Sequence, residues 1–184
     1  MNTSSLKTFA QQARQNLLSG VTQRLNFWGY DNKGNLTDEP IFVPGGMLLR
    51  EEAFDEPGAE PKWKALQRAI REHGFQHVVE EAAYTWFNRL MAIRILAKND
   101  FDFPQLEYES GMKVPVILRR ARAGNYSFLR REEGESLRKV LTDYDKEYQA
   151  FSILISGYCR HHKLLGSVFG RINDYTGLLL PSNI

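Results

Sequence analysis

Residues 79–94 read Val79-Glu80-Glu81-Ala82-Ala83-Tyr84-Thr85-Trp86-Phe87-Asn88-Arg89-Leu90-Met91-Ala92-Ile93-Arg94. They lie within a longer segment in which apolar residues recur three or four positions apart, the spacing of one face of an α-helix. The pattern predicts a helix over about residues 75–97, which Asn99 and Asp100 end. Its apolar face is wide, so we expect this helix at the centre of a helical bundle rather than at its edge.

The same periodicity predicts helices on both sides of this segment. A first helix covers about residues 5–25. A second begins at Pro61 and ends at Gly74, because proline suits the first turn of a helix and glycine suits the C-terminal cap. Further helices are expected from about Glu133 or Ser136 to Leu141, and over about residues 143–162 and 164–172. Two prolines interrupt residues 100–130, which we expect to form a loop packed on the core or a short strand.

Residues 26–60 break the helical pattern. They contain the turn sequence Asp31-Asn32-Lys33-Gly34 and the β-prone run Ile41-Phe42-Val43, which Pro44-Gly45-Gly46 follows. We therefore predict a mainly α fold, an irregular or orthogonal helical bundle with an acidic loop or small β-hairpin insertion. Residues 1–184 should form a single domain, with the acidic insertion at about 26–60 and a basic loop region at about 113–135.

Composition bounds the class of protein. Apolar residues make up 42% of the chain and charged residues 25%, as in ordinary soluble globular proteins. No apolar run approaches the roughly 18–20 residues that a membrane span requires, and the first residues lack the pattern of a signal peptide. The single cysteine, Cys159, excludes an intramolecular disulfide and fits a reducing compartment. We expect a cytoplasmic protein.

Charge is distributed unevenly along the chain. Residues 31–60 hold two basic and eight acidic residues, a local balance of −6. Residues 113–140 hold eight basic residues and three glutamates, a local balance of +5. Such asymmetry indicates a surface for a polar partner, without specifying which partner.

The arginines of the basic segment are the best candidates for contacts with DNA or an acidic protein. Several cations along one surface favour phosphate contacts, each of which releases counterions. The candidates are Arg119, Arg120, Arg122, Arg130 and Arg131. The alternative is a solvated or salt-bridged face, in which these arginines pair with Glu132, Glu133 and Glu135.

Other patterns carry little chemistry. No Ser/His/Asp or Cys/His arrangement for nucleophilic catalysis stands out, and we expect no catalytic, cofactor-binding or metal-binding residue in this chain. His161 and His162 lack partner ligands at zinc-site spacing, and Gly74 interrupts the pair His73 and His77. The segment 31–36 resembles a calcium loop only superficially, because a lysine occupies a ligand position, and a hairpin turn is expected there.

Three tryptophans and two arginines remain to be placed. We expect Trp28, Trp63 and Trp86 in the core rather than on a base-stacking platform. Arg89 and Arg94 are five positions apart on one helix and cannot share a face. One of them is expected to pair with an acidic residue of the 31–60 insertion or to lie beside Trp86.

Three patches carry a family resemblance. They are residues 1–14, residues 83–94 and Phe169-Gly170-Arg171-Ile172-Asn173-Asp174-Tyr175-Thr176-Gly177-Leu178-Leu179-Leu180-Pro181. In this order the patches resemble the N-terminal region of the PglX-type adenine-specific DNA methyltransferases of BREX phage-exclusion systems. The residues that carry the resemblance most specifically are Tyr84, Trp86, Asn88, Arg89, Asp174 and Tyr175.

The resemblance implies an enzyme that transfers a methyl group from S-adenosylmethionine to adenine N6 in DNA. The sequence itself lacks the Asn/Asp-Pro-Pro-Tyr/Phe loop that holds a flipped adenine and the glycine-bearing loop that approaches the cofactor. We therefore expect the catalytic domain to lie downstream, and this chain to have no chemistry and no cofactor of its own. Both a truncated protein and a free-standing relative of the N-terminal domain fit this pattern.

Three functions follow as hypotheses. The first is an accessory domain that packs on the catalytic domain and contributes to DNA engagement or partner docking. The second is a protein-interaction module for other defence components or for a DNA-mimicking inhibitor. The third is a structural cap on the apolar surface of the catalytic domain.

Overall fold

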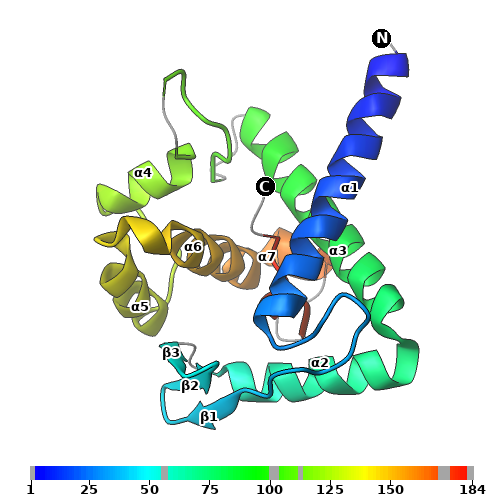
Figure 1. Cartoon of the computed structure of the whole chain (residues 1–184). Coiled ribbons are helices and arrows are strands. Elements are labelled where there is room, and N and C mark those ends of the chain that lie inside the picture. Colours follow the sequence, from blue (N-terminus) through cyan, green and yellow to red (C-terminus); the bar gives the residue numbers. More distant parts are fainter. Residues whose placement is uncertain (1–2, 55–57, 100–103, 112–113, 170–174, 182–184) are drawn as a thin grey trace. The chain divides into compact units, whose positions relative to one another are not determined.

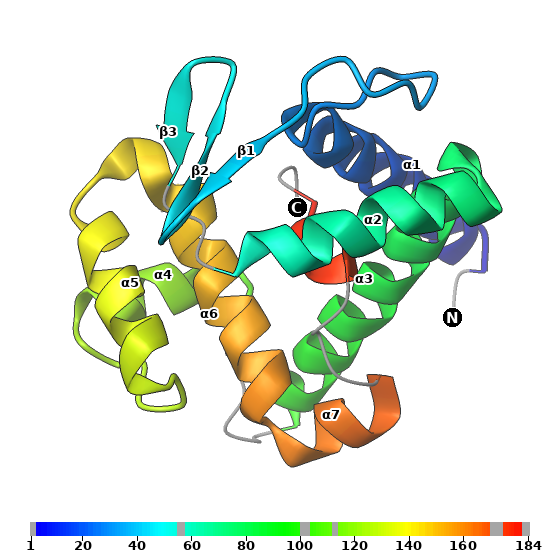
Figure 2. The same cartoon turned by 90° about the horizontal axis from the view of Figure 1, so that it is seen from below.

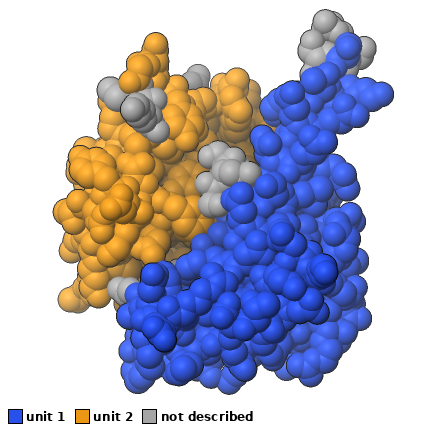
Figure 3. Space-filling model, in the orientation of Figure 1, with its two compact units in different colours: residues 1–87, 173–184 blue, residues 88–172 orange. Residues whose placement is uncertain are grey.

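The computed structural model describes residues 3–54, 58–99, 104–111, 114–169 and 175–181. Helices predominate, and one small antiparallel sheet accompanies them, which confirms the predicted mainly α class (Figure 1). The chain divides into two compact units, which Figure 3 shows in blue and orange. The first unit comprises residues 1–87 and 173–184, and the second comprises residues 88–172. No helix in the described ranges is long and apolar enough to cross a membrane.

The first unit contains the helices α1 (Thr3–Phe27) and α2 (Ala59–His73) and the beginning of α3 (Phe75–Lys98). The predicted end of α2 at Gly74 is confirmed: this glycine has a φ of 88°, and its N–H donates to the carbonyl of Ile70. α3 begins at the next residue, and Figures 1 and 2 show the sharp change of direction between the two helices. The short 3-10 helix η2 (Tyr175–Leu178) lies against α2.

The acidic insertion forms one strand more than predicted. Strands β1 (Ile41–Val43), β2 (Gly46–Leu49) and β3 (Glu52–Phe54) pair in sequence order as two successive antiparallel hairpins. Gly45 forms the first turn with a φ of 88°, as glycine permits. Arg50 and Glu51 form the second turn with φ angles of 53° and 67°. Two consecutive left-handed residues are typical of a type I′ hairpin turn, which usually requires Asn or Gly. Arg50 and Glu51 are neither, so no local signal predicted β3.

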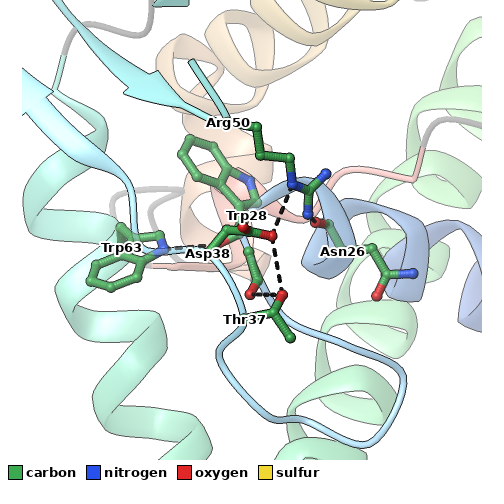
Figure 4. Close-up of polar contacts among 7 residues, drawn as sticks. Asn26, Trp28, Thr37, Asp38, Arg50 and Trp63 are labelled. Carbon is green, nitrogen blue, oxygen red and sulfur yellow. Dashed lines mark hydrogen bonds and ion pairs between the residues drawn. The ribbon is translucent and has the colours of Figure 1, made fainter. Parts of the chain in front are cut away.

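Hydrogen bonds tie this insertion to the end of α1 (Figure 4). Arg50 reaches back from the second hairpin turn: its Nε lies 3.0 Å from Asp38 Oδ2, and its terminal nitrogen donates to the carbonyl of Asn26 at 2.8 Å. The Thr37 hydroxyl donates to the carbonyl of Gly29 at 3.0 Å. The acidic insertion is thus anchored partly through one of its own two basic residues.

Where the structure describes it, the second unit contains the rest of α3 and four further helices. They are α4 (Val116–Arg122), α5 (Arg131–Leu141), α6 (Glu147–His161) and α7 (Lys163–Phe169), with the 3-10 turn η1 (Tyr144–Lys146) before α6. α6 packs against α4, α5 and α7. The core of the second unit includes the fully buried side chains of Leu137, Leu154, Ile155 and Leu165.

The basic segment is more helical than predicted. The region 113–135, which we expected to be a loop, contains α4 and the first residues of α5. Pro115 was interpreted as an interruption, but it occupies the position before the first residue of α4 with an extended backbone. A proline there costs no helical hydrogen bond, because the first N–H groups of a helix have no partner within it. Proline therefore marks the start of this helix rather than its absence.

Candidate functional site

The five candidate arginines all lie in the second unit and are exposed. Arg119, Arg120 and Arg122 belong to α4, whereas Arg130 precedes α5 and Arg131 is its first residue. The sequence treated them as one cluster. The structure distributes them between two surfaces with different partners.

The α4 arginines are partly paired. Arg119 forms an ion pair with Glu109. Arg122 lies 2.7 Å from Glu147 Oε1, and its guanidinium carbon is 4.6 Å from the centre of the Tyr144 ring. Arg120 is exposed, and no ion pair of its side chain occurs among the described residues. Of the α4 cations, Arg120 is the most available to an incoming anion.

The α5 arginines line a polar hollow of about 430 Å³. Arg131 Nε lies 3.0 Å from Glu135 Oε1. Arg138, in the last turn of α5, donates from Nε to the Tyr126 hydroxyl at 2.9 Å, a hydrogen bond that raises the pKa of the guanidinium. The lining residues are Gly124, Tyr126, Ser127, Leu129, Arg130, Arg131, Gly134, Glu135 and Arg138. Sequence reasoning missed Arg138, although it follows Arg131 by seven positions, a spacing that places both side chains on one face of a helix.

Glu133 is the centre of a second polar cluster, which joins α5 to α6. Its carboxylate accepts the backbone N–H of Arg130 at 3.0 Å, the Arg160 terminal nitrogen at 2.6 Å and a hydrogen bond with His161 Nε2 at 2.9 Å. Burial would raise the pKa of Glu133, but the bonds from Arg130 and Arg160 outweigh burial and hold the pKa below its ordinary range. Of the acidic partners expected from the sequence, Glu135 pairs with a candidate arginine, whereas Glu133 joins the start of α5 to the end of α6.

Replacing Glu133 with glutamine should lower the free energy of unfolding by about 2–3 kcal/mol at pH 7, because charge-assisted hydrogen bonds are lost in a partly buried site. The carboxylate has a depressed pKa in the folded state. Its contribution is therefore complete above the ordinary value of 4.5 and is lost as the pH falls through the lower folded value. Urea unfolding of the unchanged chain and of the Glu133→Gln variant, at several pH values from 7 to 3, measures the difference between their free energies of unfolding. A difference that stays constant across that range would contradict the assignment.

Cys159 and the histidines show no arrangement for catalysis. Burial raises the pKa of the Cys159 thiol to about 11, against the opposing influence of Arg89 and Arg160, so the thiol is unreactive near neutral pH. The rings of His73 and His77 lie 5.6 Å apart on either side of the helix break at Gly74. Within the described ranges, no group of three or more His, Cys, Asp or Glu residues could hold a metal ion.

The structure joins two of the three family patches within the first unit. The indole N–H of Trp86 donates to the carbonyl of Thr176 at 2.9 Å, and the Tyr175 hydroxyl donates to Glu81. The other tryptophans are also structural. The indole N–H of Trp28 donates to the carbonyl of Leu178 at 3.1 Å. The indole N–H of Trp63 donates to the carbonyl of Trp28 at 3.2 Å (Figure 4). All three indoles are buried, as predicted.

The remaining motif residues divide by exposure. Tyr84 is 71% exposed, Asn88 is half-buried, and Arg89 is buried with 2% exposure. Arg94 lies 3.2 Å from Glu107, so its partner is not in the 31–60 insertion, where a partner for one of the two arginines was expected. Glu107 precedes α4 in a segment whose backbone pairs with the start of that helix, a tertiary contact that the spacing of charges does not reveal. Asp174 lies outside the described residues.

Comparison with known proteins places these motifs in a class. No protein-family model matches the chain. Two curated relatives that the chain matches are adenine-specific methyltransferases. The methyltransferase BrxX of Escherichia coli O9:H4 (strain HS) is 31% identical over 191 residues, which cover 100% of this chain and 16% of the relative. The methyltransferase PglX of Lacticaseibacillus casei (strain Zhang) is 29% identical over 206 residues, which cover 97% of this chain and 16% of the relative.

These matches confirm the resemblance found in the sequence. The chain is similar over nearly its whole length to part of PglX-type adenine-specific methyltransferases, and it spans 16% of the length of each of these relatives.

Proposed function

We propose that this chain is an accessory region of an S-adenosylmethionine-dependent adenine-N6 DNA methyltransferase in phage defence, and that the second unit contributes to DNA engagement. The match to two methyltransferases over the whole chain supports the parentage. The distribution of charge supports the role. The second unit holds 15 Lys and Arg against 10 Asp and Glu, a balance of +5, whereas the first unit holds 9 against 12, a balance of −3.

The ion pairs on α4 are compatible with DNA binding. The side chains of Arg119 and Glu109 are both about half exposed, and exposed ion pairs contribute little to stability. A DNA phosphate can therefore replace a glutamate as the arginine's partner at small cost. Arg120 adds a cation without a carboxylate partner among the described residues. The catalytic chemistry and the cofactor belong to the rest of such a methyltransferase, in this proposal.

The test is a fluorescence-anisotropy titration of duplex DNA with the chain, at 50 and 200 mM salt. We expect weak binding that falls steeply with salt, since each phosphate contact releases counterions. Changing Arg119, Arg120 and Arg122 together to alanine should weaken binding at 50 mM salt about tenfold or more and reduce the salt dependence.

The control removes the same charge from exposed positions of the first unit, as Lys7→Ala, Lys33→Ala and Arg68→Ala. It should retain most of the affinity. Equal affinity of the α4 variant and the unchanged chain would remove DNA contact by α4 from the proposal.

The alternative functions, a protein-interaction module or a structural cap, have one observation in their favour. An apolar groove of about 240 Å³ lies between α1 and α3 in the first unit, and Phe9 and Tyr84 are 45% and 71% exposed. Its lining residues are Ala10, Arg14, Leu17, Leu18, Glu80, Ala83, Tyr84 and Phe87. A cap would leave the isolated chain prone to self-association, so a monomer at high concentration in sedimentation velocity would count against that role. A protein partner that DNA fails to displace would favour the interaction module.

A further inference from the structure

The polar hollow beside α5 differs from the α4 surface in shape and in the state of its cations. It is concave, with a volume of about 430 Å³, and three arginines line it together with one glutamate. The lining therefore has a balance of two positive charges. A concave site concentrates the field of such charges and holds a ligand from several sides.

The hydrogen-bonding groups of the hollow are directed by neighbouring contacts. The bond from Arg138 Nε to the Tyr126 hydroxyl leaves the terminal guanidinium nitrogens without a carboxylate partner among the described residues, and leaves the phenolic proton able to donate. Ser127 contributes a second hydroxyl to the lining. Gly134 has no side chain, and the nearest atom to the place of a Cβ is the Tyr126 ring at 3.6 Å.

The three arginines differ in availability. No carboxylate forms an ion pair with Arg130 in the part of the chain that the structure describes. Arg131 pairs with Glu135 four residues along α5, but its side chain is 92% exposed, so the pair is weak and easily exchanged. Glu135 is thus the one group of the hollow that opposes an anion.

We propose that this hollow binds a phosphate group through Arg130, Arg131 and Arg138. Guanidinium groups match the geometry of phosphate oxygens in bidentate pairs, and the two hydroxyls supply further donors. The inference deepens the proposed function and rests on it for one point only, that the phosphate belongs to DNA. Free phosphate esters have the same chemistry.

The binding test uses the whole chain and inorganic phosphate. Backbone amide NMR spectra are recorded during titration with sodium phosphate, and again with sodium chloride at equal ionic strength. Saturable shifts confined to residues around the hollow, in phosphate alone, are expected. Identical shifts in the two salts would overturn the inference.

Three variants make the test specific. Arg130→Gln removes a cation that forms no ion pair within the described residues, and should weaken phosphate binding about tenfold, the effect of one charge-assisted hydrogen bond. Glu135→Gln removes the opposing charge and should tighten binding about threefold, a gain that misfolding cannot produce. Lys163→Gln removes an exposed charge on α7, outside the hollow, and should leave affinity within about twofold. Equal effects of Arg130→Gln and Lys163→Gln would also overturn the inference.

A competition arm identifies the source of the phosphate. Duplex DNA that displaces phosphate, and binds more weakly to the Arg130→Gln variant, supports a DNA phosphate in the hollow. Displacement by a nucleoside monophosphate but not by duplex DNA supports the site and assigns it to free phosphate esters. In that case the hollow is still a phosphate site. The variant with Arg119, Arg120 and Arg122 changed to alanine then tests separately whether α4 contacts DNA.

Discussion

Replacing Trp86 with alanine is expected to lower the free energy of unfolding by about 3–5 kcal/mol. The indole is fully buried, so its removal leaves a cavity in the core of the first unit. The carbonyl of Thr176 also loses the donor that lies 2.9 Å away. Urea denaturation followed by circular dichroism measures the loss.

Two further variants separate the contributions to this effect. Tyr84→Ala, two residues earlier on the same helix, removes a ring that is 71% exposed and should cost at most about 0.5 kcal/mol. Trp86→Phe retains much of the apolar volume but lacks the N–H. Its loss of free energy of unfolding should lie between the losses of Trp86→Ala and Tyr84→Ala. Equal losses for Trp86→Ala and Tyr84→Ala would show that Trp86 does not join the two family patches.

Replacing Gly29 with alanine should cost about 3–5 kcal/mol, through the backbone rather than a side chain. Gly29 has a φ of 97°, and a Cβ placed there would lie 1.8 Å from the carbonyl oxygen of Asp38. The backbone cannot move away easily, because the Gly29 carbonyl accepts the N–H of Thr37 at 2.7 Å and that of Asp38 at 3.2 Å. The change should therefore loosen the attachment of the acidic insertion to α1.

Gly45→Ala is the matched control. Gly45 has a similar φ of 88°, but no atom lies within 4 Å of the place of its Cβ. Gly45→Ala should therefore lower the free energy of unfolding only by the cost of a left-handed backbone at alanine, about 1–2 kcal/mol. The two variants are compared by their midpoints of urea unfolding, and similar midpoints would mean that the close approach to Asp38 has no effect on stability.

The helices were largely predictable because their signals are local. The predicted segment 75–97 corresponds to α3 at Phe75–Lys98, and Gly74 ends α2 where the glycine indicated. The errors occurred where local signals were weak or ambiguous. Arg50 and Glu51 adopt left-handed conformations that neither residue favours, and contacts of the hairpin with α1 hold them there. Pro115 was interpreted as an interruption of helical structure, but it immediately precedes the helix α4.

The candidate site was predictable only as a set of charges. The sequence placed Arg119, Arg122 and Arg131 in a basic segment. It offered Glu135 as a partner, which pairs with Arg131, but it did not indicate Glu109 and Glu147 as the partners of Arg119 and Arg122. Glu147 is 25 positions from Arg122 and reaches it only because α4 packs against α6. Arg138 was counted among the charges without a role, and the fold of residues 124–138 makes it part of a concave surface.

Periodicity and capping residues were enough to predict a mainly α chain, because these signals depend on neighbours in the sequence. Three separated patches were enough to predict its relation to the PglX-type methyltransferases. Which charged groups neutralise one another, and which surround a hollow, depends on contacts between distant segments. The helix α3, which contains Trp86, illustrates both cases. Its apolar spacing predicted a buried helix, and only the folded chain showed that its indole bonds to Thr176, 90 positions away.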